Sequence, residues 1–342
     1  MKKFLNIFLL LLILTMVACE KSDDEDPVNN TPENNTPANN TTPGNNTESE
    51  KVSDPEKTND PEKNNESENT TPEPGSKKIG LVLSGGGAKG AAEIGALKVI
   101  EKQGIHIDYI AGTSIGAIVG SMYAAGYTVE ELEQFILTLN PDDAKSSPAI
   151  KKILGNFLQN KGVTTFADLK IPFRCVAADT KTLSEVVFKD GNLLDAVMAS
   201  AAIPVMYDNV HIGDQILVDG GIYNNLPVDV AINMGAEYII AIDLSQANES
   251  LVPGAYAGMV ESILQAPEMA KGILGDAMDI VLDYFTNRPD QAKYDENIKK
   301  ADILIHPVLS GFGSLDFGAD NCQPMIEIGE KTAEEVDWSK EI

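Results

Sequence analysis

Short apolar runs alternate with longer segments of helical periodicity from Ile79 onward. This alternation is typical of an α/β domain, in which buried strands are joined by amphipathic helices. The runs predict strands at Ile79–Leu83, Tyr109–Ala111, Phe173–Ala177, Ile216–Val218, Tyr238–Ile242 and Ile303–Ile305. The longer segments predict helices at Ala88–Gln103, Ile115–Ala125, Val129–Leu139, Leu193–Ala199 and about Ala255–Phe285. We therefore expect a three-layer α/β/α domain over 79–342 with a central mostly parallel sheet, its core at about 79–245 and a C-terminal helical region and last strand at about 255–315.

The first 18 residues predict a lipoprotein signal peptide. Two lysines precede an apolar run from Phe4 to Leu14, and small residues lead to Cys19, which is the order of a secretory signal. The stretch from Phe4 to Ala18, about 15 residues, is shorter than the roughly 20 that cross a bilayer as a helix. Met16–Cys19 resembles a bacterial lipobox, with Met where Leu is usual. Cys19 is therefore the expected lipidation site, and ordinary cleavage beside an incidental cysteine is the alternative.

Residues 19–78 predict the lipidated cysteine followed by a disordered acidic stalk. The segment is rich in Asn, Thr, Pro, Glu, Asp and Lys and has almost no large apolar residue, so burial cannot offset the entropy of ordering it. The acidic run Asp23–Asp26 resembles surface-export signals of some bacterial lipoproteins. We expect a protein of the bacterial cell envelope, attached to the membrane through its N-terminal lipid, with the outer membrane or the cell surface as the finer expectation.

Charge narrows the classes of partner. Residues 79–342 contain 37 acidic and 18 basic residues, and a domain this acidic repels phosphate backbones, which argues against nucleic-acid binding. It also repels anionic lipid surfaces, so a covalent lipid anchor matters more for keeping the domain at a membrane. Beyond Cys19 only Cys175 and Cys322 are present, too few for a disulfide framework.

The segment SGGGAKG, Ser84–Gly90, follows an apolar strand and opens a helix. Its glycines leave backbone N–H groups unobstructed near the positive end of a helix dipole, which favours anion binding. The same glycines satisfy the dinucleotide fingerprint G-x-G-x-x-G, so an oxidoreductase is an alternative. The acidic residue that this fingerprint requires would be Asp108, which precedes the second strand instead of following it.

The segment GTSIG, Gly112–Gly116, also joins a strand to a helix. This is the context of a nucleophile elbow, in which flanking glycines allow a sharp turn that exposes the serine hydroxyl. Ser114 is therefore the candidate nucleophile. A serine in an ordinary glycine-rich turn is the alternative.

A serine nucleophile needs a base. Of three histidines, only His306 follows the serine in the order of an ordinary Ser-Asp-His triad. Carboxylates that follow strand-like runs are the other candidates: Asp179, Asp219 and Asp243. Asp219 differs from the other two because Gly220 and Gly221 follow it and leave space for a substrate.

Four motifs occur in order along the chain: SGGGAKG at Ser84–Gly90, GTSIG at Gly112–Gly116, ASAAIP at Ala199–Pro204 and VDGG at Val218–Gly221. With the trailing segment DILIHPVLSGFGSLDF, they make residues 79 to about 315 resemble the bacterial patatin-like phospholipase family. The resemblance implies a dyad of Ser114 and Asp219 that works without histidine. It also implies an oxyanion hole formed by Gly85, Gly86 and Gly87, with Lys89 where the family has Arg or Lys.

The resemblance implies cleavage of fatty-acyl ester bonds of phospholipids or lysophospholipids through an acyl-enzyme, with neither metal nor cofactor. The remaining alternatives are an esterase whose triad uses His306 and a catalytically silent lipid-binding lipoprotein. One departure from the family is Glu93, where many relatives carry His. We expect Glu93 to be exposed on the helix surface.

Overall fold

The computed structural model describes residues 77–144, 146–204, 206–246 and 289–339. Its strands are β1 (Ile79–Leu83), β2 (Tyr109–Thr113), β3 (Phe173–Asp179), β4 (Ser184–Phe188), β5 (Val210–Ile212), β6 (Gln215–Asp219), β7 (Tyr238–Ile242) and β8 (Ile303–Ile305). Its α-helices are α2 (Ala91–Lys102), α3 (Ile115–Ala124), α4 (Val129–Thr138), α5 (Pro141–Ala144), α6 (Ser147–Asn160), α7 (Leu193–Ser200), α8 (Gly221–Asn224), α9 (Val228–Met234), α13 (Pro289–Lys300) and α14 (Ala319–Glu334). The signal peptide, Cys19, almost all of the stalk and the helical region expected at about 255–285 lie outside the described residues.

The described strands form one mixed sheet in the order β5-β6-β3-β2-β1-β7-β8, with β4 paired to β3. β1 runs parallel to β2 and β7, β2 to β3, and β7 to β8. β4 and β6 run antiparallel to β3, and β5 antiparallel to β6. The expectation of a mostly parallel sheet is confirmed, with an antiparallel extension on the β3 side.

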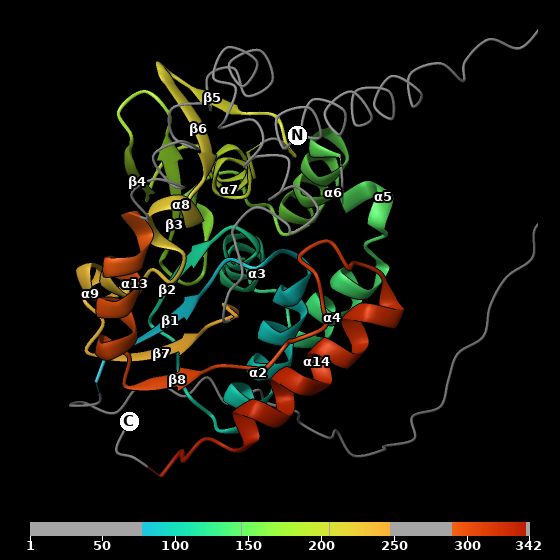
Figure 1. Cartoon of the computed structure of the whole chain (residues 1–342), viewed down its shortest axis with the longest axis vertical. Helices are drawn as coiled ribbons and strands as arrows, with labels where there is room; N and C mark the ends of the chain where they lie inside the picture. Colours follow the sequence, from blue (N-terminus) through green and yellow to red (C-terminus); the bar gives the residue numbers. More distant parts are fainter. Residues whose placement is uncertain (1–76, 145, 205, 247–288, 340–342) are drawn as a thin grey trace, which may run out of the picture. The chain divides into compact units, whose positions relative to one another are not determined.

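Helices cover both faces of this sheet (Figure 1). Successive side chains of a strand point to opposite faces, so Leu81 and Leu83 of β1 enter a large apolar cluster with residues of α2, α3, α4 and α14. Val82 enters a second cluster with residues of α9 and α13. The expected three-layer α/β/α architecture follows from this division.

The six predicted strands are all present, whereas β4, β5 and several helices were not predicted. β5 is only three residues long, and β4 is only partly buried, so neither leaves a long apolar run. The signal for α6 was in the sequence. Ser146 caps its first turn by accepting the Ala149 N–H at 3.4 Å, and Pro148 follows within that turn, both of which mark a helix start.

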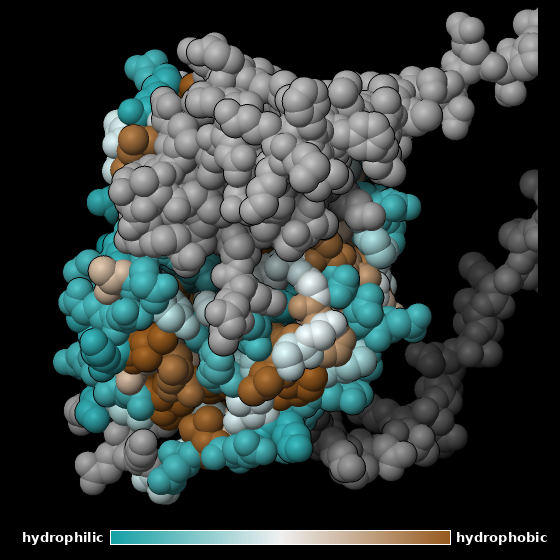
Figure 2. All heavy atoms as spheres, in the orientation of Figure 1, coloured by the Kyte–Doolittle hydropathy of each residue, from teal (hydrophilic) through white to brown (hydrophobic). Residues whose placement is uncertain are grey.

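Hydrophilic side chains alternate with smaller apolar patches on the face seen in Figure 2. Large apolar side chains that are exposed in the described part of the chain are Leu183, Val187, Ile232 and Val308. None of the helices described is long and apolar enough to cross a bilayer.

Candidate active site

Ser114 lies in the tight turn between β2 and α3. Its backbone has φ 56° and ψ −123°, a conformation that non-glycine residues rarely adopt and that stores strain. The flanking glycines are needed for space. A Cβ on Gly112 would lie 2.4 Å from the Gly116 carbonyl oxygen, and one on Gly116 would lie 2.4 Å from the Leu83 carbonyl oxygen. The turn thus has the strained backbone of a nucleophile elbow.

Asp219 is the last residue of β6, and the sheet register brings it to the end of β2. Thr113, the last residue of β2, pairs with Val176 of β3, and Asp219 pairs with the next residue, Ala177. β4 occupies the other edge of β3 at both positions. β2 and the antiparallel β6 therefore meet end to end along one edge of β3, and Ser114 and Asp219 meet at that junction.

The Asp219 carboxyl is buried, with 1% of the residue exposed. Burial raises the pKa of Asp219 to about 6, and the Ser114 hydroxyl and the Gly221 N–H oppose that rise. The Gly221 N–H donates to Oδ1 at 2.8 Å. Oδ2 has no hydrogen-bond partner of regular geometry, and the Ser114 hydroxyl is the side-chain group that opposes the rise in the pKa of Asp219.

The glycine loop lies beside Ser114, since a Cβ on Gly85 would be 3.1 Å from the Ser114 Cβ. The Gly85 N–H is already bound to the Asn225 carbonyl at 3.1 Å. The N–H groups of Gly86 and Gly87 have no backbone acceptor among the described residues. Of the three glycine amides expected as oxyanion donors, those of Gly86 and Gly87 are therefore the ones without a backbone acceptor among the described residues. Lys89 is buried at the start of the helical segment that follows, with 1% exposed.

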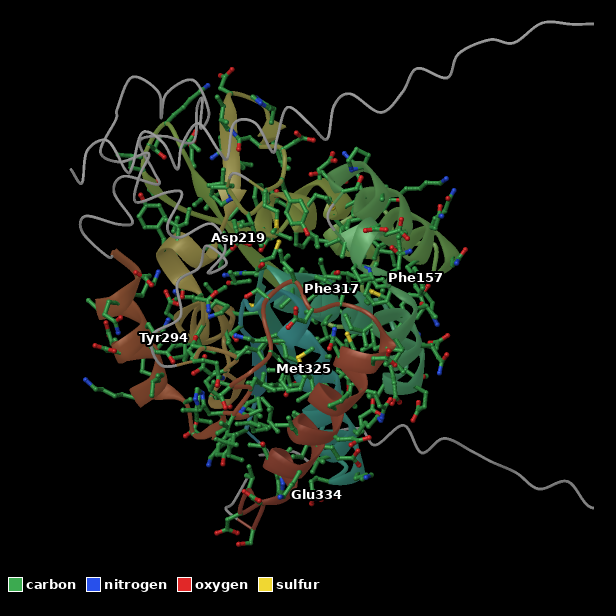
Figure 3. All side chains as sticks on the ribbon, turned by 45° about the vertical axis from the view of Figure 1, so that its right-hand side comes forward. Phe157, Asp219, Tyr294, Phe317, Met325 and Glu334 are labelled. Carbon is green, nitrogen blue, oxygen red and sulfur yellow. The ribbon has the colours of Figure 1, made fainter. Side chains whose placement is uncertain are left out.

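An apolar cavity of about 500 Å³ opens beside Ser114 and Gly87. Its apolar lining comes mainly from α3, α4, α6, α7 and the loop before α14, and includes Ile118, Phe135, Leu139, Ile153, Leu154 and Phe317. Figure 3 shows Phe317 and Asp219 in the interior of the described domain. Sequence reasoning missed this lining because the residues belong to separate elements, one of which, α6, was not predicted.

His306 belongs to a different cluster, at the ends of β7 and β8. Its Nδ1 lies 2.9 Å from Asp243 Oδ2, and the Tyr294 hydroxyl donates to the same oxygen at 2.6 Å. The bond to Asp243 raises the pKa of His306. In Figure 3, Tyr294 on α13 lies well apart from Asp219. The structure thus brings Ser114 to Asp219 and pairs His306 with Asp243.

Glu93 corrects a sequence expectation. The side chain is fully buried in the first turn of α2, not exposed. Neither carboxylate oxygen has a hydrogen-bond partner of regular geometry. Burial raises the pKa of Glu93 well above its usual value, and the Ser84 backbone opposes that rise. The expectation failed because α2 is covered by the sheet on one side and by α14 on another, so its polar positions do not mark a solvent-exposed face.

The geometry also argues against the dinucleotide alternative. The carboxylate of Asp108 accepts the Ile79 N–H at 2.9 Å and the Lys78 ammonium at 2.7 Å, so it lies where β1 begins. The glycine loop lies where β1 ends. A ribose-binding acid is needed at that second edge of the sheet. In the described ranges, no group of three or more His, Cys, Asp or Glu side chains is placed to hold a metal ion.

Comparison with known proteins finds a matching family model and related proteins. A family model for patatin-like phospholipases matches residues 81–232. An uncharacterised NTE family protein of Mycobacterium tuberculosis is 29% identical over 259 residues, which cover 70% of this chain and 43% of that protein. Human patatin-like phospholipase domain-containing protein 6 is 33% identical over 192 residues, covering 50% of this chain and 14% of that protein. The chain thus spans less than half the length of these relatives.

Among solved structures, the crystal structure of VipD from Legionella pneumophila is similar, with a TM-score of 0.43 and 13% sequence identity. The match covers 76% of this chain and 66% of that chain.

Proposed function

Because this chain belongs to the patatin-like phospholipase family, we propose that it is a serine acylhydrolase acting on fatty-acyl ester bonds of phospholipids or lysophospholipids. One observation supports this most directly. Ser114, on a strained turn, meets the buried carboxylate of Asp219 beside an apolar cavity. The apolar cavity can hold a fatty-acyl chain, and Ser114 with Asp219 as its base can attack the ester bond of that chain.

In the proposed reaction, Asp219 accepts the hydroxyl proton of Ser114 as Oγ attacks the ester carbonyl carbon. The oxyanion of the tetrahedral intermediate accepts hydrogen bonds from the Gly86 and Gly87 N–H groups, each worth on the order of 3 kcal/mol. Collapse of the intermediate breaks the ester bond, and the departing alcohol takes the proton from Asp219. Water then attacks the acyl-enzyme, giving its proton to Asp219, and the fatty acid leaves as Ser114 recovers its proton.

The lining of the cavity supports a fatty-acyl chain as the bound part of the substrate, because it is mostly apolar over a volume of about 500 Å³. The polar headgroup then remains outside the apolar lining, toward solvent or the membrane surface.

Three substitutions test the dyad in one assay of ester hydrolysis. Ser114→Ala and Asp219→Asn should each reduce kcat to background, because each removes one half of the proton-transfer pair. His306→Ala should retain activity, because His306 is bound to Asp243 instead. Loss of activity in His306→Ala, with activity retained in Asp219→Asn, would favour the ordinary triad.

A fluorophosphonate probe separates the enzyme from a silent lipid-binding protein. Covalent labelling of wild-type protein, lost in Ser114→Ala, is the expected result. Wild-type protein that binds lipid but neither labels nor turns over would favour the silent lipoprotein.

Attachment to the bacterial envelope through lipidated Cys19 completes the proposal. Mass spectrometry of the mature N-terminus should find acyl groups on Cys19. A cleaved but unmodified N-terminus would contradict it.

A further inference from the structure

The motif Ala199–Pro204 has no role in the chemistry described so far. It forms the end of α7 and the turn that follows. Its residues lie between the elbow and the end of β6, and Ala201 and Ala202 also line the cavity. The contacts that this segment makes on its two sides suggest what it does.

On one side, the segment holds the backbone of the nucleophile. The N–H of Ser114 donates to the hydroxyl oxygen of Ser200 at 3.0 Å. Ser200 is fully buried, so water cannot replace this acceptor. An N–H group buried without an acceptor is costly. The strained backbone of Ser114 also requires neighbouring contacts that hold it in place.

On the other side, the same segment holds the backbone of the base. The Asp219 N–H donates to the Ala202 carbonyl at 2.8 Å, and the Gly220 N–H donates to the Ser200 carbonyl at 3.3 Å. Gly220 must be glycine here, because a Cβ would lie 2.1 Å from the Val176 carbonyl oxygen. The end of α7 is therefore hydrogen-bonded to both members of the pair.

We infer that Ser200 is a positioning residue that fixes the Ser114 turn relative to Asp219 through its hydroxyl. The inference rests on the proposed function for its catalytic consequence. β3 aligns the last residues of β2 and β6, but Ser114 lies beyond that register. The Ser200 hydroxyl binds the next backbone N–H along the chain, which is that of Ser114. Holding this N–H in place also orients the Ser114 side chain.

This contact also affects the oxyanion site. Because the Ser114 N–H is bound to Ser200, it is not available to an oxyanion. Stabilisation of the tetrahedral intermediate then depends on the glycine loop, where the Gly86 and Gly87 N–H groups have no backbone acceptor among the described residues.

The test is Ser200→Ala in the full chain, which removes the acceptor and leaves the backbone contacts to Asp219 and Gly220 in place. We expect kcat to fall about 10- to 100-fold with KM nearly unchanged, since small misplacements of reacting groups have effects of that size. Hydrogen–deuterium exchange should show faster exchange at the Ser114 amide, while the melting temperature stays within about 5 °C of wild type.

Ser121→Ala is the matched control. Ser121 is also fully buried and donates its hydroxyl to the Ile118 carbonyl at 2.9 Å, within α3 and away from Asp219. It should leave kcat and the Ser114 amide unchanged. Ser200→Cys, which keeps a weak acceptor of similar size, should recover part of the lost kcat.

Unchanged kcat and unchanged Ser114 exchange in Ser200→Ala would overturn the inference, as would an equal loss of kcat in Ser121→Ala. Should Ser200→Ala fail to fold, Ser200→Cys decides by the same two readouts, and wild-type values for both would count against Ser200. Failure of the proposed function looks different, because wild-type protein would then show neither turnover nor fluorophosphonate labelling. In that case the exchange of the Ser114 amide still decides whether Ser200 holds it.

Discussion

Two buried aspartates at the carboxyl edge of the sheet differ in how their oxygens are satisfied. Asp243 binds His306 and Tyr294 through Oδ2 and the Ser245 N–H through Oδ1. Asp219 binds one backbone N–H through Oδ1 and leaves Oδ2 without a regular partner. A carboxylate with an open oxygen can accept a proton from a nearby hydroxyl, whereas a fully bonded one has a structural role. This difference, more than burial, distinguishes the candidate base.

The raised pKa of Asp219 predicts the pH dependence of hydrolysis. Only the ionised carboxylate accepts the Ser114 proton, so kcat/KM should rise with pH through an apparent pKa of about 6 and level off above it. Rates measured from pH 4.5 to 8 on a neutral ester substrate would show this limb. A profile that is flat across this range would contradict the assignment of Asp219 as the base.

Glu93 predicts a stability effect that depends on pH. The pKa of Glu93 is raised in the folded protein, so the folded protein keeps a proton that the unfolded chain releases. Stability is therefore lost as pH rises from the ordinary pKa of a glutamate toward the raised pKa of Glu93. Glu93→Leu should raise the free energy of unfolding by about 1 to 3 kcal/mol, since it removes a fully buried carboxyl that has no hydrogen-bond partner of regular geometry. The gain should be larger at pH 8 than at pH 4.5 in urea titrations.

Glu93→Gln is the control, because it removes the ionisable group and keeps the volume and polarity. It should reproduce only the pH-dependent part of the gain. An equal gain for Glu93→Leu at both pH values would show that Glu93 does not titrate in this range.

At the scale of elements, α14 packs directly on the backbone of α2. A Cβ on Gly95 would lie 2.0 Å from the Ile326 carbonyl oxygen, and one on Gly329 would lie 2.0 Å from the Ala92 carbonyl oxygen. The loop before α14 reaches the active site, where the Ser314 carbonyl accepts the Ala88 N–H at 2.8 Å. The close packing of α14 on α2 therefore also positions the loop that lines one side of the cavity.

Gly95→Ala should force the two helices apart, because the new methyl group would meet backbone atoms that cannot move alone. We expect a loss of about 1 to 3 kcal/mol in the free energy of unfolding and lower hydrolytic activity, as the Ser314 loop shifts. Gly155→Ala is the control within α6, where the new Cβ meets only a terminal methyl of Leu194 at 3.1 Å. It should change stability by less than about 1 kcal/mol; equal losses in both variants would refute the close contact as the cause.

At the scale of the whole molecule, charge and the proposed anchor act in opposite directions at a membrane. Residues 79–342 contain 37 acidic and 18 basic residues, so an anionic lipid surface repels this part of the chain. The proposed lipid on Cys19 would keep it near a membrane despite that repulsion. On electrostatic grounds we therefore expect neutral or zwitterionic lipids to be the better substrates.

Turnover should be faster on zwitterionic vesicles than on vesicles of the same acyl composition that carry anionic headgroups. The difference should shrink between 0.05 and 0.5 M salt, since screening shortens the range of the repulsion to a few ångströms, on the order of the Debye length. A soluble short-chain ester, whose rate should not depend on salt, controls for effects on the chemistry. Faster turnover on the anionic vesicles would contradict the prediction.

Much of the fold was predictable because its signals are local. Apolar runs predicted the six strands β1, β2, β3, β6, β7 and β8. Glycine spacing predicted the turn at Ser114, whose positive φ follows from sterics within a few residues. Those same local signals placed Ser114 and Asp219 at strand ends and made the family resemblance visible. β4 and β5 gave no such signal, because β4 is only partly buried and β5 is three residues long, so neither leaves a long apolar run.

The sequence by itself determined the strand ends, the strained elbow and the acidic charge, because each depends on neighbouring residues or on composition. Only the tertiary structure decided which groups meet. It placed β2 and β6 end to end along β3, bound the Gly85 amide to Asn225, and buried Glu93 in the first turn of α2. The physical reason is that contacts between distant segments depend on sheet register and helix packing, which no periodicity within one segment encodes.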